Sequence, residues 1–378
     1  MRVTMINKYY PPHLGGIEVS LARLATALAL RPEMDVRVLV ANEARDDVTE
    51  TLEGVEILRM GRLFAYASTP VALGMTNAIR HEATRRTRAD LLHLHFPYPW
   101  GEISWLRAAP KLPGVVTYHS DIVRQKRMLA LYRPILERFL DRIDLVIASA
   151  PPMVEHSPFL SPVAEKCRFV PFGIPVERFE ATPETVARAE ALRAGHERPI
   201  VLFVGRLIYY KGADVLVRAM RHVDADLVMI GRGPLESELR ELAVAHGVND
   251  RVTWVPGVSD EDLAAWYRAA AVFCLPSVAP SEAYGLVQLE AHASGTPVVS
   301  TNLPTAVPWV NEDGVTGLVV PVGDAEALGD ALARIVTDVE LRARLGAQAE
   351  ERARHEFTVE RMVDRTVAVY EELLGGRP

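Results

Sequence analysis

Two glutamates near the end of an apolar run carry the chemistry most suited to binding a polar ligand. Glu282 follows the apolar run Val272–Leu275, and Glu290 lies eight positions further on in a helical pattern. At about 100° per residue their directions differ by about 80°, so both can face one pocket. Carboxylate oxygens accept hydrogen bonds from vicinal hydroxyls of a sugar or a ribose. The N–H groups near Gly285 and Leu286 present an anion site at the helix start; the alternative is a pair of solvated helix charges.

A second group of residues could hold phosphate. Gly205-Arg206 ends the apolar run Ile200–Val204, and Lys211-Gly212 lies five positions further on. At the carboxyl end of a parallel strand, a guanidinium and an ammonium from one loop would hold a diphosphate. In the first half, Gly15-Gly16 precedes a helical pattern whose N-terminal N–H groups attract anions. The alternatives are two solvated cations and a tight turn.

Alternating apolar and helical patterns predict the elements that position these residues. Runs rich in Val, Ile and Leu separated by helical patterns are typical of βαβ units with a largely parallel, buried sheet. We expect strands in the first half at Val3–Ile6, Val36–Val40, Val55–Met60, Leu91–Leu94, Val115–Tyr118, Leu145–Ala148 and Arg168–Val170. We expect strands in the second half at Ile200–Val204, Leu227–Ile230, Val252–Val255, Val272–Leu275, Val298–Ser300 and Leu318–Val320. We expect helices near Glu18–Leu30, Ala213–His222, Pro234–His246, Asp260–Ala270 and Val359–Leu374.

Length and composition predict a folded protein of two domains. The 378 residues exceed the roughly 100–200 of one domain, and the cluster Pro171, Gly173 and Pro175 is a plausible linker. Cys167 and Cys274 lie far apart with no Cys or His neighbours at metal-ligand spacing, which argues against a disulfide scaffold and structural zinc. The net charge of −7 argues against a nucleic-acid binder with a wholly basic surface.

Two common nucleotide-binding motifs are missing. Gly231-Arg232-Gly233 is followed by Pro234, Leu235 and Glu236, so it does not complete the G-x-G-x-x-G fingerprint of dinucleotide-binding enzymes. The sequence also lacks the G-x-x-x-x-G-K-[ST] motif of P-loop enzymes. A dehydrogenase and a P-loop enzyme are therefore disfavoured.

Taken together, these motifs resemble glycosyltransferase family 4, whose members are retaining enzymes of the GT-B fold. The resemblance runs in order from the first expected strand almost to the C-terminus. It rests on Gly15-Gly16, His119, Gly205-Arg206, Lys211-Gly212, Gly231-Arg232-Gly233-Pro234, Glu282 and Glu290, Gly295-Thr296-Pro297-Val298-Val299, and Gly314-Val315-Thr316-Gly317-Leu318-Val319.

The resemblance implies an α/β protein with two Rossmann-like α/β/α domains facing a cleft. It implies an acceptor-side domain at residues 1–175 and a nucleotide-sugar-binding domain at residues 176–358. The C-terminal helix, residues 359–378, is expected to cross back to the first domain.

Residue by residue, the resemblance also implies a site. Arg206 and Lys211 would neutralise the donor diphosphate, Glu282 would contact donor-sugar hydroxyls, Glu290 would hold the ribose hydroxyls, and the N–H of Gly16 would approach the distal phosphate.

The remaining roles follow from the same resemblance. His119 would bond a donor-sugar hydroxyl or a backbone carbonyl near the anomeric centre, and would not bind metal. His119, Arg206, Lys211 and Glu282 form the expected catalytic set. Gly15, Gly16, Gly205, Gly231, Tyr284, Gly285, Leu286 and Glu290 form the expected donor-binding set. No metal and no cofactor beyond the nucleotide-sugar substrate is expected.

Three further signals each allow a functional and a structural interpretation. His93 and His95 share one strand face, which allows a two-ligand metal site, but without a third ligand a cluster lining the cleft is favoured. Asp224-Ala225-Asp226 precedes its apolar run, so we interpret it as a helix-to-strand turn. The stretch Arg80–Arg142 holds twelve basic and six acidic residues, with an amphipathic pattern near Arg124–Asp141. That face could dock anionic lipid and a lipid-linked acceptor; a solvated helix is the alternative.

The expected activity is hexose transfer. Tyr118-His119-Ser120-Asp121 and Thr301-Asn302-Leu303-Pro304-Thr305 with Pro308-Trp309 are similar to bacterial surface-polysaccharide mannosyl- and rhamnosyltransferases. We therefore expect mannose to move from GDP-mannose to a glycan, lipid-linked or small-molecule acceptor, in cell-surface polysaccharide or glycolipid synthesis. The alternatives are a UDP-sugar donor, a sugar-nucleotide 2-epimerase and a non-catalytic binder. We expect a cytoplasmic enzyme, free or peripheral on the inner face of the cytoplasmic membrane, and no nucleic-acid partner.

Overall fold

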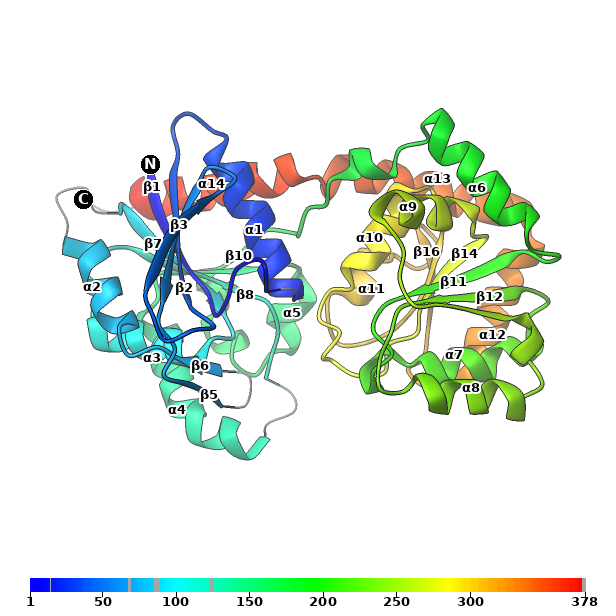
Figure 1. Cartoon of the computed structure of the whole chain (residues 1–378), viewed down its shortest axis with the longest axis horizontal. Coiled ribbons are helices and arrows are strands. Elements are labelled where there is room, and N and C mark those ends of the chain that lie inside the picture. The colour runs from blue at the N-terminus through cyan, green and yellow to red at the C-terminus, as the bar shows by residue number, and fades with distance from the viewer. Residues whose placement is uncertain (14, 67–68, 85–88, 123–125, 376–378) are drawn as a thin grey trace. The chain divides into compact units, whose positions relative to one another are not determined.

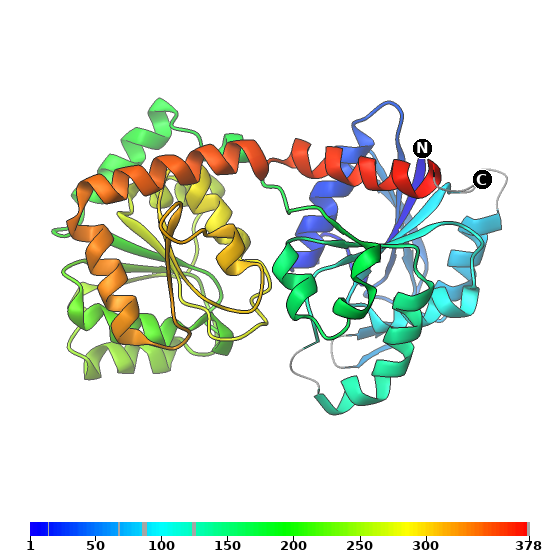
Figure 2. The same cartoon turned by 180° about the vertical axis from the view of Figure 1, so that it is seen from behind.

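The chain folds as two compact units. The computed structural model describes residues 1–378 except 14, 67–68, 85–88, 123–125 and 376–378. The first unit contains Met1–Phe172 and the C-terminal segment from Val359, and the second contains Gly173–Thr358 (Figures 1 and 2). The change of unit at residues 172–173 lies beside the breaker cluster from which the boundary at residue 175 was expected.

An eight-stranded sheet forms the centre of the first unit. In spatial order its strands are β10 (Cys167–Phe169), β9 (Leu145–Ala148), β8 (Gly114–Tyr118), β7 (Leu91–Phe96), β1 (Arg2–Ile6), β2 (Asp35–Ala41), β4 (Val55–Met60) and β3 (Val48–Leu52). All neighbours run parallel except β3, which is antiparallel to β4. A separate antiparallel pair joins β5 (Phe64–Tyr66) to β6 (Thr69–Val71).

Helices cover both faces of this sheet. The elements are α1 (Gly16–Ala29), α2 (Met75–Thr84), α3 (Pro99–Ala108), α4 (Lys126–Arg142), α5 (Pro151–His156) and α14 (Val359–Gly375). Helices α1 and α14 pack together on one face, while α2, α3 and α4 pack in series on the other (Figure 1). The buried strands therefore need apolar residues on both sides, which explains their nearly continuous Val, Ile and Leu runs.

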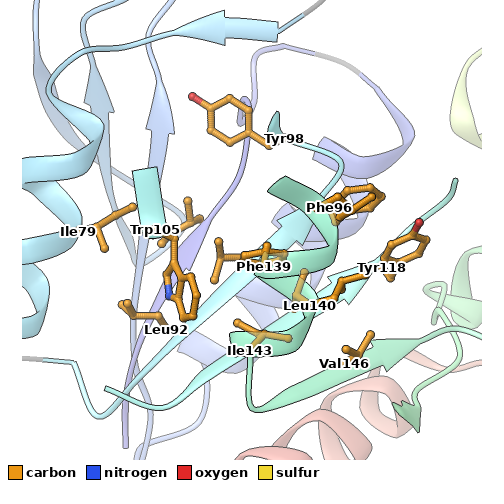
Figure 3. Packing of buried hydrophobic residues seen from close by; sticks show 14 of the residues in the cluster. Ile79, Leu92, Phe96, Tyr98, Trp105, Tyr118, Phe139, Leu140, Ile143 and Val146 are labelled. Atoms are coloured by element: carbon orange, nitrogen blue, oxygen red, sulfur yellow. The ribbon is translucent and has the colours of Figure 1, made fainter. Parts of the chain in front are cut away.

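Aromatic rings pack among aliphatic side chains in the core on the α3 and α4 side (Figure 3). Trp105 of α3 and Phe139 of α4 meet edge to face, with ring centroids 5.4 Å apart (Figure 3). Phe96, at the end of β7, stacks on Tyr118, at the end of β8, at 4.2 Å. Because these two rings are buried at the carboxyl ends of adjacent strands, they fix the position of the loops that follow.

The second unit repeats the architecture with a six-stranded, fully parallel sheet. In spatial order its strands are β13 (Val252–Val255), β12 (Asp226–Ile230), β11 (Ile200–Val204), β14 (Val272–Leu275), β15 (Val298–Thr301) and β16 (Gly317–Val320). Its helices are α6 (Pro183–Ala194), α7 (Ala213–Ala219), α8 (Glu236–Ala245), α9 (Asp260–Ala269), α10 (Leu286–Ala293), α11 (Val307–Val310), α12 (Ala325–Thr337) and α13 (Val339–Glu356). Helices α7, α8 and α12 lie on one face and α6, α9, α10 and α13 on the other (Figure 1).

The C-terminal helix belongs to the first unit, as the family resemblance implied. Tyr370 of α14 bonds His93 of β7, with 2.6 Å between the hydroxyl oxygen and Nδ1. At the surface, Glu372 pairs with Arg168, and Asp364 pairs with Arg31. The chain thus returns to the first sheet after completing the second, so the first unit is built from two distant parts of the sequence, whereas the second is one continuous segment.

The described residues include no helix that is both long enough and apolar enough to cross a bilayer.

Candidate functional site

Gly205 and Gly231, two glycines of the expected donor-binding set, lie against each other where β11 and β12 end. A Cβ on Gly231, whose φ is +140°, would lie 2.0 Å from the carbonyl oxygen of Gly205. The N–H of Gly205 donates to Ile230 O at 2.9 Å, so the two strand ends leave the sheet together. A side chain at residue 231 would push apart the two loops that the sequence assigned to donor binding.

The loop after β11 is also held against the loop after β14. Gly212 has φ +64°, and a Cβ there would lie 1.9 Å from the carbonyl oxygen of Pro276. Next to this contact, the N–H of Val278 donates to Tyr210 O at 2.8 Å. This close approach of two backbones places Lys211 of the first loop beside Glu282 of the second.

Lys211 and Glu282 form a buried ion pair. Their Nζ and Oε2 atoms lie 2.6 Å apart, and the side chains are only 11% and 9% exposed. The hydroxyl of Ser277 donates to the same carboxylate oxygen at 3.1 Å. Each charge therefore has a partner inside the protein, which a buried charge requires. The structure thus joins two residues that the sequence assigned to different parts of a donor, its diphosphate and its sugar.

Arg206, the other predicted cation, has a different environment. It immediately follows Gly205, and its side chain is exposed. The Arg206 side chain makes no hydrogen bond or ion pair with the described residues, whereas Lys211 is buried against Glu282. The two cations come from one loop, as expected, but only Lys211 has its charge balanced by the protein.

Helix α10 begins at three residues of the expected donor-binding set, Tyr284, Gly285 and Leu286. Gly285 is its N-cap, and the buried Tyr284 carbonyl accepts a hydrogen bond from Gln288 at 2.6 Å. The first N–H groups of α10 therefore lie at the carboxyl end of the sheet, just after the loop that carries Glu282. A helix N-terminus at this edge favours an anion.

Glu290 lies in α10 and contacts a residue that the sequence did not single out. Its Oε2 accepts a hydrogen bond from the hydroxyl of Tyr267, on α9, at 2.9 Å. Burial, together with the Glu290 carboxylate, raises the pKa of Tyr267 well above its usual value, so the phenol remains a donor. Glu282 thus pairs with Lys211, whereas Glu290 contacts Tyr267. The sequence did not indicate a site role for Tyr267, because an aromatic residue in an amphipathic helix is also what ordinary core packing requires.

The glycine pair of the first unit has two different environments. A Cβ on Gly15 would lie 2.2 Å from Oε2 of Glu18, whereas one on Gly16 would meet no atom within 4 Å. Glu18 is buried in the first turn of α1, and its carboxylate lies 4.0 Å from Nζ of Lys8. Gly15 therefore packs closely against the end of the Glu18 side chain, while the surroundings of Gly16 leave room for a ligand. Approach of a phosphate to Gly16 stays a prediction, and the carboxylate beside it was not anticipated.

His119 is buried directly after β8. Its Nε2 lies 2.9 Å from Nδ1 of His95, and its ring stacks on Phe172 with centroids 5.3 Å apart. Burial lowers the pKa of His119 to about 3. The ring is therefore neutral at physiological pH, which suits a hydrogen-bonding role rather than that of a general acid.

Three further residues weighed as metal ligands, His93, Asp224 and Asp226, have structural partners. His93 uses both ring nitrogens, one with Tyr370 at 2.6 Å and one with Thr117 at 2.7 Å. Asp224 and Asp226 both pair with Arg198 at the start of β12, which confirms the helix-to-strand turn. Within the described part of the chain, no three His, Cys, Asp or Glu side chains gather as metal ligands.

The predicted amphipathic face lies on α4. Arg124 falls outside the described residues, while Leu131 of α4 is 83% exposed. An apolar hollow of about 280 Å³ lies between this helix and the β5–β6 pair, at the carboxyl end of β7 and β8. It is lined by Phe64, Tyr66, Thr69, Val71, Pro99, Ile122, Met128, Leu129 and Tyr132.

Comparison with known proteins identifies the family. Residues 14–178 match the family model described as Glycosyltransferase Family 4, and residues 187–352 match that of Glycosyl transferases group 1. The chain is 33% identical over 380 residues to the O-antigen chain mannosyltransferase C of Escherichia coli, covering 99% of each chain. The chain belongs to glycosyltransferase family 4.

Two further comparisons agree. The chain is 36% identical over 374 residues to a GDP-mannose-dependent alpha-(1-6)-phosphatidylinositol monomannoside mannosyltransferase of Mycobacterium tuberculosis, covering 93% of each. It superimposes on sucrose-phosphate synthase from Thermosynechococcus elongatus over 100% of both chains, with a TM-score of 0.81 and 25% identity. The resemblance read from the motifs is confirmed, and this family 4 member is a glycosyltransferase of the GT-B fold.

The ion pair yields a stability prediction. Lys211→Met should lower the free energy of unfolding by about 3–5 kcal/mol, because it leaves the Glu282 carboxylate buried without its cation. The double variant Lys211→Met/Glu282→Gln should be more stable than Lys211→Met alone, since both charges are gone. Urea denaturation of the full chain measures both. A double variant no more stable than Lys211→Met would contradict the pairing.

Proposed function

We propose that this glycosyltransferase moves mannose, with retention of configuration, from GDP-mannose to a hydroxyl of a glycan or lipid-linked acceptor in surface polysaccharide or glycolipid synthesis. The observation that carries the proposal is the Lys211–Glu282 pair at the strand ends of the second unit, beside Arg206 and the N-terminus of α10. Its charges and donors suit a diphosphate joined to a sugar. The choice of mannose and of GDP is supported by the names of the relatives from Escherichia coli and Mycobacterium tuberculosis.

Binding of the donor would give Arg206 a partner and would rearrange the contacts of Lys211 and Glu282. Arg206 is exposed and unpaired among the described residues, so it can bind a phosphate without first breaking an ion pair. Lys211 would share its charge between Glu282 and the diphosphate, using a second N–H of its ammonium group. Glu282 would then accept a hydrogen bond from a sugar hydroxyl with its other carboxylate oxygen, and Glu290 would bind the ribose.

In the transfer step, the bond between the sugar C1 and the distal phosphate oxygen breaks while C1 bonds to the acceptor oxygen on the same face. The acceptor hydroxyl gives its proton to an oxygen of the departing diphosphate, so no enzyme nucleophile is required. Arg206 and Lys211 would stabilise the negative charge that grows on that diphosphate, worth a few kcal/mol for each preorganised group. We propose that this charge stabilisation replaces a catalytic metal ion.

The first unit would supply the remaining contacts. The neutral ring of His119 would bond an oxygen near the anomeric centre, and the open space around Gly16 would admit the distal phosphate. We also propose that the apolar hollow beside α4 takes the apolar part of a lipid-linked acceptor, with Leu131 and Met128 contacting the membrane surface.

A transfer assay tests the donor and the role of Arg206. With GDP-, UDP- and dTDP-sugars in turn, and EDTA present, GDP-mannose should support transfer and give an α-linked product. Arg206→Ala should lower kcat by about 10²–10³-fold without changing thermal stability, because the side chain has no partner in the described protein. Arg221→Ala, an exposed arginine of the same unit, is the control.

Each other outcome of this assay identifies a rival. Transfer only from a UDP-sugar would replace GDP-mannose as the donor, and conversion of the donor without acceptor would indicate an epimerase. Binding without any turnover would indicate a non-catalytic binder. An unchanged kcat in Arg206→Ala would remove this residue from the site.

Vesicle binding tests the membrane contact. Leu131→Glu should reduce co-sedimentation with vesicles of anionic phospholipid, because it places a carboxylate on the exposed apolar face of α4. Leu30→Glu, at the end of α1, is the matched control, since Leu30 is similarly exposed at 79%. Equal sedimentation of both variants and the unmodified protein would refute contact through α4.

A further inference from the structure

His119, the predicted catalytic histidine, is hydrogen-bonded to a second buried histidine, His95. His95, on β7, and His119, after the neighbouring β8, approach through Nδ1 and Nε2 at 2.9 Å. Burial lowers the pKa of both rings far enough to keep them neutral at physiological pH. Each neutral imidazole carries one N–H, so one of the two facing nitrogens donates and the other accepts.

The bond therefore has two possible arrangements. In the first, His95 donates through Nδ1–H, its Nε2 is a bare lone pair, and His119 carries its proton on Nδ1. In the second, His119 donates through Nε2–H, its Nδ1 is a bare lone pair, and His95 carries its proton on Nε2. The two arrangements differ in what His119 offers to a substrate, a donor in the first and an acceptor in the second.

The surroundings of His95 Nε2 distinguish them. This atom is fully enclosed and has no hydrogen-bond partner in the described part of the chain. The ring stacked on it, His93 at 4.5 Å, already uses both of its own nitrogens with Tyr370 and Thr117. The second arrangement would bury an N–H with no acceptor, and orphaned buried N–H groups are rarer in proteins than under-satisfied acceptors.

We propose that His95 donates Nδ1–H to Nε2 of His119 and thereby holds His119 in the tautomer that carries its proton on Nδ1. His95 is then a positioning residue. Phe172 fixes the same ring from its face, at an interplanar angle of 7°. Nδ1 of His119 makes no hydrogen bond with the described residues, and it is not among the fully enclosed atoms.

The tautomer selects what His119 can bind. An Nδ1–H donates to an oxygen lone pair of the sugar or phosphate and cannot accept a proton from a hydroxyl. This consequence for the substrate rests on the proposed function, whereas the tautomer itself does not. His119 would thus stabilise oxygen atoms that gain negative charge, in agreement with the cations of the second unit.

Nitrogen-15 NMR of histidine-labelled full-length protein tests the tautomer without any substrate. In the unmodified chain, the two-bond correlations of His119 should identify Nδ1 as the protonated nitrogen and Nε2 as the bare one. His119→Gln assigns the resonance. A His119 spectrum with the proton on Nε2 would overturn the proposal.

Variants of His95 test the positioning role. Asn can turn an amide N–H toward the position of His95 Nδ1, so His95→Asn should retain the Nδ1–H tautomer of His119. His95→Leu should lose it and lower kcat by up to about 10²-fold, with a smaller change in KM. Tyr370→Phe, which removes a hydrogen bond from the neighbouring His93 but leaves the histidine pair intact, is the control.

The outcomes separate this inference from the proposed function. If transfer occurs but His119 carries its proton on Nε2, the inference fails and the function stands. If the Nδ1–H tautomer is found but no sugar donor supports transfer, the function fails and the inference stands. Should His95→Leu fail to fold, His95→Asn and the spectrum of the unmodified protein still decide the question. If a folded His95→Leu variant has the same His119 tautomer and the same kcat as the unmodified protein, the positioning role is also overturned.

Discussion

The buried ion pair between Lys211 and Glu282 is the interaction on which the second unit's site depends. It joins the loops after β11 and β14, and it forms only because Gly212 lets two backbones meet. Removing two charges from water is costly, and apolar residues of similar size often give equal or greater stability. A pair kept at the open edge of a sheet is therefore better explained by a ligand that needs both charges than by stability.

The first unit offers neutral histidine rings where the second unit has a pair of opposite charges. His93, His95 and His119 are buried and neutral, and their rings stack in series from the core to the end of β8. Such rings orient hydrogen bonds without adding charge. In the proposed reaction, cations of the second unit would bind the diphosphate, and the neutral ring of His119 would orient a hydrogen bond. Glu18, buried beside Gly15, is the exception within the first unit, and it places a negative charge where a phosphate was expected.

The buried strands could be predicted because each is an apolar run covered on both faces. The strand β3, with every residue exposed, could not, since it has no buried face to give its sequence a period. The positions of Lys211 and Glu282 at strand ends were predictable, but their direct contact was not, because it depends on a backbone approach between residues 212 and 276. Tyr267, the partner of Glu290, was equally hidden, since tertiary packing alone brings α9 beside α10.

Hydrogen exchange of the full chain, with and without GDP-mannose, tests the central claim that the strand-end loops around this ion pair bind the donor. The account predicts slower exchange at residues 205–212 and 277–290 when the donor is added, because their N–H groups and side chains would contact the diphosphate and sugar. Unchanged exchange in both segments, with protection confined to other parts of the chain, would contradict it.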